Sequence, residues 1–401
     1  MLQNAGLESA QAQIIKHTRL LNAENIPLMA TLGRVSAVDL LADNDLPSCA
    51  QSAVDGFALA DEGELGRDRY RIAGRLSLGD VPSVPLQPGQ AVGILTGGNL
   101  PSGTRAVIPH EKVEKQDNII LAREVVKPGN NIKAAGEDYK EGDQLLTRGA
   151  VLTPGQISLL AAYGVVAIPV VRKPRVAVLC LSRHVVPWQV NPQPGQIRDS
   201  NGPLLTTLVR QDGGLPVAIE TAPSNRAALE KAASLLELAD ILIMTGGTYA
   251  ESGYEARQVM EELGSELIYW DIPIQPGSHT GAGSCDSRLL FALSGNPGAC
   301  AVGYHLFVAP AVRALQGLSS VGQHQKAICI NGFDKKSGSR RFIRAKASWD
   351  QEGWQVAVLP GQKPSMIRSL VDCNALIDVP AGSPPIEPGQ EVSILLLGIQ
   401  C

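Results

Sequence analysis

The feature that most constrains the fold is an alternation of strand-like and helix-like segments over residues 174–316. Short apolar runs typical of buried strands are followed by segments with helical periodicity. Strands are expected at residues 175–181, 216–222, 240–244 and 288–293, and helices at 201–211, 225–237, 255–263 and 297–315. This order indicates a doubly wound, mostly parallel sheet, whose ligands lie at the carboxyl ends of the strands.

On either side of this α/β region the pattern changes to short strands and turns. Residues 35–126 contain β-branched runs separated by turn residues, which indicates a small β-rich domain. Residues 317–401 show a similar pattern and predict a C-terminal β-barrel or sandwich. Helical patterns are present at residues 8–24 and 154–163. The chain is therefore expected to be a multi-domain α/β plus β protein.

Charge and hydropathy exclude several classes of function. The 35 Lys and Arg residues and the 39 Asp and Glu residues are interspersed, and the net charge of -4 leaves no broad basic field for nucleic acid. The apolar runs are shorter than the ~20 residues that cross a bilayer, and the N-terminus lacks a signal-peptide layout. We therefore expect a cytoplasmic protein without a membrane or nucleic-acid partner. The seven cysteines form no Cys-x-x-Cys pair, which argues against a zinc ribbon or a disulfide framework.

Two strand-to-helix junctions carry glycine where the chain leaves a strand. Residues 241–248 read ILIMTGGT, and residues 291–298 read FALSGNPG. Such junctions let backbone amides and a helix N-terminus approach a phosphate without obstruction by side chains. Either junction alone is explained by an ordinary tight turn. Two at the binding edge of one sheet favour a ligand site.

Two acidic loops lie outside the α/β region. Asp55 precedes a glycine in the β-rich domain, and Asp138 follows Gly136 and Glu137. Oxygen ligands of this type suit Mg²⁺, which often needs only one or two carboxylates besides ligand phosphates. Spacing alone favours the simpler interpretation, because Asp beside Gly is a common turn pair.

Other polar positions carry weaker signals. Ser200 or Asn201 can cap the helix that follows, and capping alone would explain them. His279 lies in a glycine-rich loop at residues 276–283 and has no partner that the sequence identifies. The chain contains no His-Glu-x-x-His pattern, nucleophile elbow or Walker loop, so hydrolase and NTPase functions lose their main support.

Taken in order, these motifs resemble those of the MoeA/gephyrin E-domain family, the molybdopterin molybdenumtransferases. Residues 52–58, SAVDGFA, are similar to the family's S-A-M-D-G-Y-A, and residues 95–107, LTGGNLPSGTRAV, to its T-G-A-x-x-P-x-G-A-D-A-V. The fragments GED (136–138), PGQIRDSN (194–201), TGG (245–247) and GNP (295–297) follow in the family's order. Each fragment is modest, but the ordered set spans essentially the whole chain and is specific.

The resemblance implies a four-part subunit. An elongated discontinuous domain (residues 1–34 and 127–173) would be interrupted by the β-rich insertion (35–126), and the α/β molybdopterin-binding domain (174–316) and the C-terminal β domain (317–401) would follow. It further implies a homodimer whose cleft joins the α/β domain of one subunit to the insertion of the other. The implied reaction uses Mg²⁺ and molybdate to convert adenylylated molybdopterin into molybdenum cofactor, with release of AMP.

The resemblance also assigns residues to that cleft. Asp55, Thr96 and Asp138 would stand where the family's acidic and hydroxyl side chains act, with Asp55 and Asp138 as metal ligands. The pterin-phosphate side would be lined by Thr245, Gly246, Gly247, Thr248, Ser294, Gly295, Asn296 and Pro297.

The sequence departs from the family in the same cleft. Residues 180–185, CLSRHV, replace S-T-G-D-E-L, so Arg183 and a histidine stand where the family has a carboxylate pair. Arg183 is a candidate replacement cation for phosphate or molybdate. Tyr254 stands at the position of a family aspartate, with Glu251 and Glu255 as displaced candidates for its role.

A second group of departures removes positive charge. The family's K-P-G-K-P loop is QPGSH here, so Gln275 and Ser278 replace two lysines, and His279 follows them as another candidate replacement group. Ser294 replaces the first proline of L-P-G-N-P. Preorganised charged groups contribute a few kcal/mol of transition-state stabilisation each, so these changes bear directly on activity.

Three functions follow from this pattern. The leading hypothesis is a molybdopterin molybdenumtransferase-like enzyme that acts as a homodimer. The alternative is a catalytically altered paralogue that binds or carries the pterin for a molybdoenzyme or pathway partner, without turnover. A third is a scaffold that keeps only the fold and the dimer, since fold alone does not guarantee function.

Overall fold

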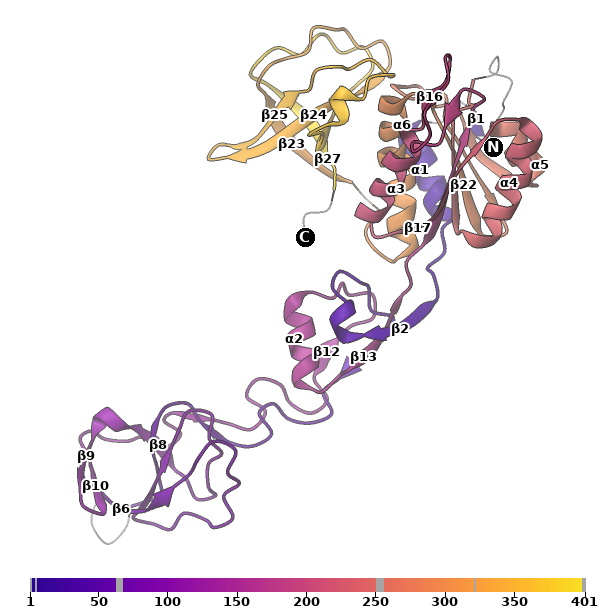
Figure 1. Cartoon of the computed structure of the whole chain (residues 1–401). Coiled ribbons are helices and arrows are strands. Elements are labelled where there is room, and N and C mark those ends of the chain that lie inside the picture. The colour runs from indigo at the N-terminus through magenta and orange to yellow at the C-terminus, as the bar shows by residue number, and fades with distance from the viewer. Residues whose placement is uncertain (1, 4–5, 63–67, 250–255, 321, 399–401) are drawn as a thin grey trace. The chain divides into compact units, whose positions relative to one another are not determined.

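The computed structural model describes residues 2–3, 6–62, 68–249, 256–320 and 322–398 (Figure 1). The chain forms two compact units. Unit 1 contains Met1–Ile26, Gly33–Ala37 and Pro169–Cys401, and unit 2 contains Pro27–Leu32 and Val38–Ile168. The finer four-part division of the chain stays a proposal.

A mixed seven-stranded sheet forms the centre of unit 1, in the order β1-β19-β21-β22-β18-β14-β17. Four strands were expected from the sequence, and three parallel pairings join them: β14 to β17, β14 to β18 and β18 to β22. Their bounds are Arg175–Leu181 (β14), Leu215–Ala222 (β17), Ile241–Thr245 (β18) and Arg288–Leu293 (β22). The expectation of a mostly parallel α/β sheet is therefore confirmed.

The far half of the sheet was not expected. β19 (Glu266–Trp270) and β21 (Gly281–Cys285) pair antiparallel, β21 pairs antiparallel with β22, and β1 (Leu2–Gln3) runs parallel to β19. The sequence indicated a loop over residues 276–283, yet its last residues begin a strand. A Cβ atom on Gly281 would lie 2.1 Å from the Trp270 ring, so glycine here allows the backbone to pass close to an indole.

Helices cover both faces of this sheet (Figure 1). Val176 and Val178 of β14 point into one core and Ala177 and Leu179 into the other, the two-residue period of a strand buried on both sides. The first core also contains residues of α1 (Leu7–Lys16), α3 and the helical run 297–315. The second core contains residues of α4 and α5. The helices are α3 (Asn201–Gln211), α4 (Asn225–Leu238), α5 (Ala256–Glu262), and a continuous run of α6 (Pro297–Gly303), the π-helix η4 (Tyr304–Val308) and α7 (Ala309–Leu315).

Among the described residues, one helical run, Pro297–Leu315, has the length and mean hydropathy of a membrane span. Within it, 78% of the apolar window is buried inside the protein, as expected of a core helix.

The N-terminal helix is shorter than the helical pattern at 8–24 predicted. α1 spans Leu7–Lys16, and the chain then turns into β2 (Ala23–Pro27), which pairs with β13 (Ala167–Val171). Thr18 ends the helix by donating its hydroxyl to the carbonyl of Ile15 at 2.6 Å. The buried residues Leu7, Ala10 and Ile14 lie in the core, so burial supports the helix only along its first turns.

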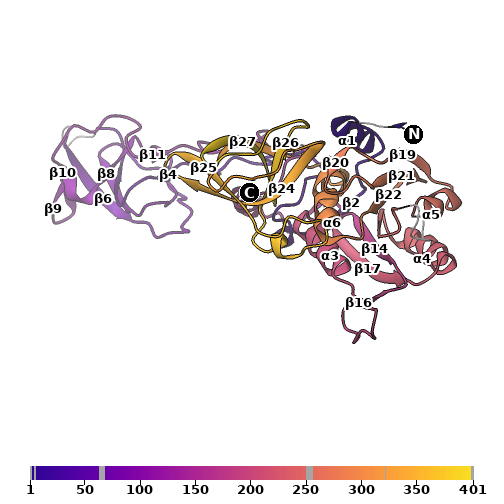
Figure 2. The same cartoon turned by 90° about the horizontal axis from the view of Figure 1, so that it is seen from above.

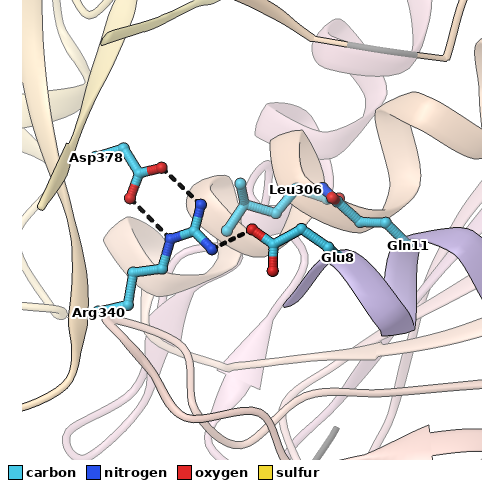
Figure 3. Close-up of polar contacts among 5 residues, drawn as sticks. All are labelled: Glu8, Gln11, Leu306, Arg340 and Asp378. Carbon is cyan, nitrogen blue, oxygen red and sulfur yellow. Dashed lines mark hydrogen bonds and ion pairs between the residues drawn. The ribbon is translucent and has the colours of Figure 1, made fainter. Parts of the chain in front are cut away.

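Polar contacts fix α1 against the rest of unit 1 (Figure 3). Gln11 donates to the carbonyl of Leu306 in η4 at 2.8 Å. Arg340 forms a bidentate pair with Asp378 at 2.8 and 2.7 Å and also donates to Glu8 of α1.

The C-terminal segment forms a β-barrel, one of the two folds that its strand pattern predicted. Its strands are β23 (Gln323–Cys329), β24 (Arg340–Asp350), β25 (Gly353–Val358), β26 (Ala375–Val379) and β27 (Gln390–Leu396). The order β24-β25-β23-β27-β26 closes because β24 also pairs with β26. The short strand β20 (Ile274–Gln275) runs parallel to the start of β24, and η5 (Arg368–Leu370) lies between β25 and β26.

Unit 2 contains a six-stranded sheet in the order β8-β5-β7-β6-β10-β9, which agrees with the expected β-rich region. These strands are β5 (Gly56–Leu59), β6 (Arg69–Arg75), β7 (Gln90–Ile94), β8 (Ala106–Pro109), β9 (Val113–Gln116) and β10 (Ile119–Ala122). The remaining elements are β3 (Leu40–Leu41), β4 (Gln51–Ser52), β11 (Ile132–Lys133), β12 (Gln144–Leu146), η1 (Leu28–Ala30), η2 (His110–Lys112) and α2 (Pro154–Ala162). Thr153 and Gln156 form a capping box at the start of α2, the helix predicted at 154–163.

Candidate functional site

A pocket of about 890 Å³ opens at the carboxyl ends of β14 and β18. The sheet register pairs Thr245 of β18 with Cys180 of β14 on one side and with Leu293 of β22 on the other. Each strand ends at or just after these residues. The pocket lies between these ends, the start of α3 and the loop that carries β15 (Val185–Val186) and β16 (Ile197–Arg198). Figure 2 shows that loop projecting from the α/β sheet.

Seven of the residues proposed for the pterin side line this one pocket: Arg183, Thr245, Gly246, Gly247, Gly295, Asn296 and Pro297. Thr248 and His279 instead line an adjoining cavity of about 310 Å³, which shares Gly247 with the larger pocket. There His279 bonds to Asp271 at 3.2 Å, and its ring meets the edge of Tyr249.

The other three proposed residues do not line either cavity. Ser294 accepts a bond from Thr245 on its carbonyl and one from the Asn296 amide on its hydroxyl. Gln275 belongs to β20, paired with the barrel strand β24. Ser278 follows in the same loop, and its carbonyl accepts the backbone amide of Ile272 at 2.9 Å.

The two glycine junctions contact each other in the pocket wall. Gly246 has φ +88°, which disfavours any L side chain, and a Cβ atom there would lie 2.7 Å from the carbonyl oxygen of Leu181. A Cβ atom on Gly295 would lie 3.3 Å from the Cα of Gly246. Side chains at either position would therefore press against neighbouring backbone, so glycine allows the two junctions to pack together.

Asn201 links these junctions, a role the sequence did not reveal. Its amide nitrogen donates to the Thr245 hydroxyl and to the Gly295 carbonyl, each at 2.9 Å. Asp199, not Ser200 or Asn201, supplies the capping oxygen, which accepts the backbone amide of Gly202 at 2.9 Å. Ser200 occupies the N-cap position of α3, as expected, but its side chain makes no capping bond, and Asn201 is the buried first residue of the helix.

The charged side chains among the described lining residues are mainly basic. Arg183, His184 and Arg198 line the pocket, and Asp199 is the acid among them. Asp199 is only 4% exposed, and burial raises the pKa of its carboxyl despite the backbone amides of Gly202 and Asn201. Burial also raises the pKa of the Cys180 thiol to about 12, so this thiol is neutral at pH 7.

The barrel contributes a further cation that sequence analysis missed. Ser365 and Ile367 line the pocket, and the segment that carries them surrounds the fully buried Arg344 of β24. Arg344 donates to the Ser369 hydroxyl at 2.6 Å and to the carbonyls of Gly361 and Lys363 at 3.2 Å, all neutral oxygens. Among the described residues its Nη1 finds no hydrogen-bond partner.

That guanidinium lies directly behind the second glycine junction. A Cβ atom on Gly298, in the first turn of α6, would lie 2.6 Å from the Nη1 of Arg344. Burial lowers the pKa of the Arg344 guanidinium, because desolvation disfavours its charged form. A buried cation beneath backbone amides favours an anion in the pocket in front of it. Arg344 alternates with Ile343 and Ala345 of the barrel core and shares the β24 face of Phe342, which packs in the α/β core, so the strand pattern alone gave no signal of its burial.

The acidic residues proposed as metal ligands lie in unit 2. Asp55 accepts the backbone amide of Thr96 at 2.7 Å and its hydroxyl at 2.8 Å, and these bonds lower the pKa of the Asp55 carboxyl. Asp138 lies between β11 and β12, beside a surface hollow of about 500 Å³. Among the described residues, no group of three or more His, Cys, Asp or Glu side chains could hold a metal ion. Glu251, Tyr254 and Glu255 lie outside the described residues.

Since Mg²⁺ often keeps water and takes only one or two protein carboxylates besides ligand phosphates, Asp55 and Asp138 fit it only as a partial set. The glycine junctions, in contrast, line the pocket with backbone that carries no side chain at Gly246, Gly247 and Gly295. These features suit an anionic ligand better than a metal held by protein alone.

Three family models match the chain in sequence. They are the MoeA N-terminal region (domain I and II) at residues 5–164, a probable molybdopterin binding domain at 177–314 and the MoeA C-terminal region (domain IV) at 326–397. The second match covers most of β14 and all of β18 and β22, and therefore both glycine junctions.

Full-length relatives give the same result. The molybdopterin molybdenumtransferase of Bacillus subtilis is 33% identical over 391 residues, covering 93% of this chain and 90% of the relative. That of Staphylococcus epidermidis is 31% identical over 382 residues, with the same coverage. A crystal structure of a molybdopterin biosynthesis MoeA protein from Pyrococcus horikoshii superposes with a TM-score of 0.84 at 28% identity, covering 99% of this chain and all of that one.

Proposed function

The chain belongs to the MoeA family, the molybdopterin molybdenumtransferases of molybdenum cofactor biosynthesis, and from that premise we propose that it inserts molybdate into adenylylated molybdopterin and releases AMP. The observation that carries this proposal is the single pocket formed by both glycine junctions within the molybdopterin-binding region. Thr245 to Thr248 and Ser294 to Pro297 hold the pterin and its phosphate.

The family's K-P-G-K-P loop carries two lysines, which are Gln275 and Ser278 in this chain. The cations of the pocket take the place of those lysines. Arg183 and Arg198 lie at the pocket surface, and Arg344 lies behind the first turn of α6. Together they attract the phosphate and molybdate anions that the reaction brings together. Gln275, Ser278 and His279 belong to the segment that carries the two lysines in the family, and in this proposal they orient the anions by hydrogen bonds.

Asp55, Thr96 and Asp138 serve the proposed cleft from unit 2, in a homodimer whose site is shared between subunits. Thr96 holds the Asp55 carboxylate through two hydrogen bonds and keeps it ionised. Asp55 and Asp138 would hold Mg²⁺, which neutralises developing charge on the phosphate.

A second candidate function is supported by the altered pocket. Arg183 and His184 stand where the family has a carboxylate pair, which favours anion binding over metal-assisted cleavage at that position. A protein of this kind would bind molybdopterin or the finished cofactor and carry it to a partner without turnover.

The deciding experiment supplies purified protein with adenylylated molybdopterin, Mg²⁺ and molybdate and follows AMP and bound pterin together. Release of AMP with cofactor formation is expected. Bound pterin without AMP would establish the carrier, and no bound pterin would leave only the scaffold.

Two variants test the acidic residues in the same assay. We expect Asp55→Asn and Asp138→Asn each to slow AMP release by about tenfold or more, because each removes a charged ligand. Asp117→Asn, in an exposed turn of the same unit, is the matched control and should retain the rate. Full activity of Asp55→Asn and Asp138→Asn would contradict the roles assigned to these carboxylates.

A further inference from the structure

Asn201 carries an unusual combination of contacts. The residue is only 5% exposed, yet its side chain helps to line the ligand pocket. Its amide nitrogen donates to the Thr245 hydroxyl and the Gly295 carbonyl, each at 2.9 Å. Its Oδ1 is buried and finds no hydrogen-bond partner among the described residues.

The orientation of this amide is fixed by its neighbours. A carbonyl oxygen only accepts, so the group facing Gly295 must be the amide nitrogen. The Thr245 hydroxyl donates its own hydrogen to the Ser294 carbonyl at 3.1 Å, so it too accepts from Asn201. Reversing the amide would lose both bonds, and the unpaired Oδ1 is the consequence of making them.

A buried acceptor without a partner is unfavourable, and native proteins keep few of them. A leucine of nearly the same shape would avoid it. The two N–H bonds are therefore what asparagine provides at this position and leucine would not. They join residue 245, at the end of β18, to residue 295, beyond the end of β22, across the start of α3.

These bonds determine the geometry of the pocket wall. Glycine has no side chain to restrict its backbone, so the junctions need an external restraint. Because a peptide unit is planar, holding the Gly295 carbonyl also sets the direction of the Asn296 N–H at the start of α6. The Gly246 amide also bonds the Leu293 carbonyl at 3.0 Å, and the Asn296 amide bonds the Ser294 hydroxyl at 3.3 Å. Asn201 adds the side-chain restraint that joins Thr245 directly to Gly295.

We propose that Asn201 is a positioning residue that fixes the spacing of the two glycine junctions around the anionic group of the pterin ligand. This inference rests on the proposed function, since it assumes that the pocket holds molybdopterin. Asn201 acts through Thr245 and Gly295, and it touches none of the reacting atoms.

The test compares molybdopterin affinity with thermal stability in three variants. Asn201→Leu removes both N–H donors and the unpaired oxygen together. We expect its Kd for molybdopterin to rise about tenfold to a hundredfold, the usual effect of losing a group that orients ligand-binding atoms, while its Tm stays equal or rises. A side chain with a purely structural role would give the reverse pattern.

Asn201→Asp keeps the shape and places a carboxylate oxygen against the Gly295 carbonyl. Asn201→Asp should weaken molybdopterin binding at least as strongly as Asn201→Leu. If the leucine variant does not fold, the aspartate variant still provides the affinity measurement. Asn374→Leu is the matched control, because Asn374 bonds to both backbone groups of Ala347 in the barrel. This control should lower Tm and leave the Kd unchanged.

The outcomes separate the two proposals. If the unmodified protein binds molybdopterin and both Asn201 variants bind it equally well, the positioning role is wrong and the proposed function stands. If the unmodified protein binds no molybdopterin, the proposed function fails, and the inference fails with it.

Discussion

At the scale of single residues, the buried polar groups of the pocket determine its chemistry. Arg344 is a buried cation bonded to neutral oxygens, and Asp199 is a buried acid bonded to backbone amides. Neither forms part of an ordinary surface ion pair. Asp199 lines the pocket, and Arg344 lies behind the first turn of α6, so both place charge in or near the pocket at fixed positions.

Asp199 gives a prediction about pH. Burial raises its pKa above the ordinary value of 3.8, so between that value and the raised pKa the native state binds more protons than the unfolded state. Its contribution to the free energy of unfolding therefore falls as pH rises through that window. Asp199→Asn should remove this loss and be more stable than the unmodified protein at neutral pH.

Urea unfolding measured from pH 4 to pH 8 checks this expectation. The stability difference between Asp199→Asn and the unmodified protein should grow with pH and then level off. Asp117→Asn, in an exposed turn, serves as the control and should show little change. A difference that shrinks as pH rises would mean that the Asp199 carboxylate is stabilised, not destabilised, by folding.

At the scale of elements, one arginine joins the N-terminal helix to the barrel. The Asp378 side chain is 10% exposed and that of Glu8 is 70% exposed, and both bind Arg340 (Figure 3). The bond from Arg340 is the main reason that the pKa of Glu8 is lowered. The two acids are therefore expected to contribute very differently, because solvent screens the exposed one.

Arg340→Met should lower the free energy of unfolding by about 3 kcal/mol, because it leaves the buried Asp378 carboxylate without its partner. Glu8→Gln should cost only about 0.5 kcal/mol, as for other exposed ion pairs. Urea titrations of both variants measure this, with Arg226→Met, from an exposed pair on α4, as the control. Equal losses from the two variants would show that α1, not the barrel, depends on Arg340.

At the scale of the whole molecule, the proposed shared cleft makes a prediction about mixed dimers. Asp55→Asn impairs the contribution of unit 2, and Gly246→Ala impairs the pocket, because its Cβ atom would meet the Leu181 carbonyl at 2.7 Å. Each variant alone should release little AMP. If each site uses unit 2 of one subunit and the pocket of the other, half of the randomly mixed dimers have one intact site.

Co-expression of the two variants with different affinity tags allows the mixed dimers to be isolated and assayed. An equal, unselected mixture should recover about a quarter of the unmodified rate, since half of the dimers carry one of two sites. Mixing the separately purified variants without subunit exchange is the control. If the mixed dimers release AMP no faster than the two variants do separately when their rates are added, the whole site lies within one subunit.

The sequence predicted the elements whose evidence is local. β14 and β22 have the predicted bounds, because runs that are apolar on both faces mark buried strands without reference to the rest of the chain. α3 and α2 also follow their local helical and capping patterns. The two glycine junctions could be predicted as a pair, because parallel strands end at one edge of a sheet.

By itself, the sequence determined the family, the four parallel strands with their helices, and the residues of the glycine junctions. Only the tertiary structure decided that the helical pattern ends at Lys16, that Gly281 begins a strand beside Trp270, and that Asn201 bonds inward instead of capping. The reason is that these features depend on which distant segments meet. Asn201 and Gly295 lie 94 positions apart, and no local pattern encodes a bond between them.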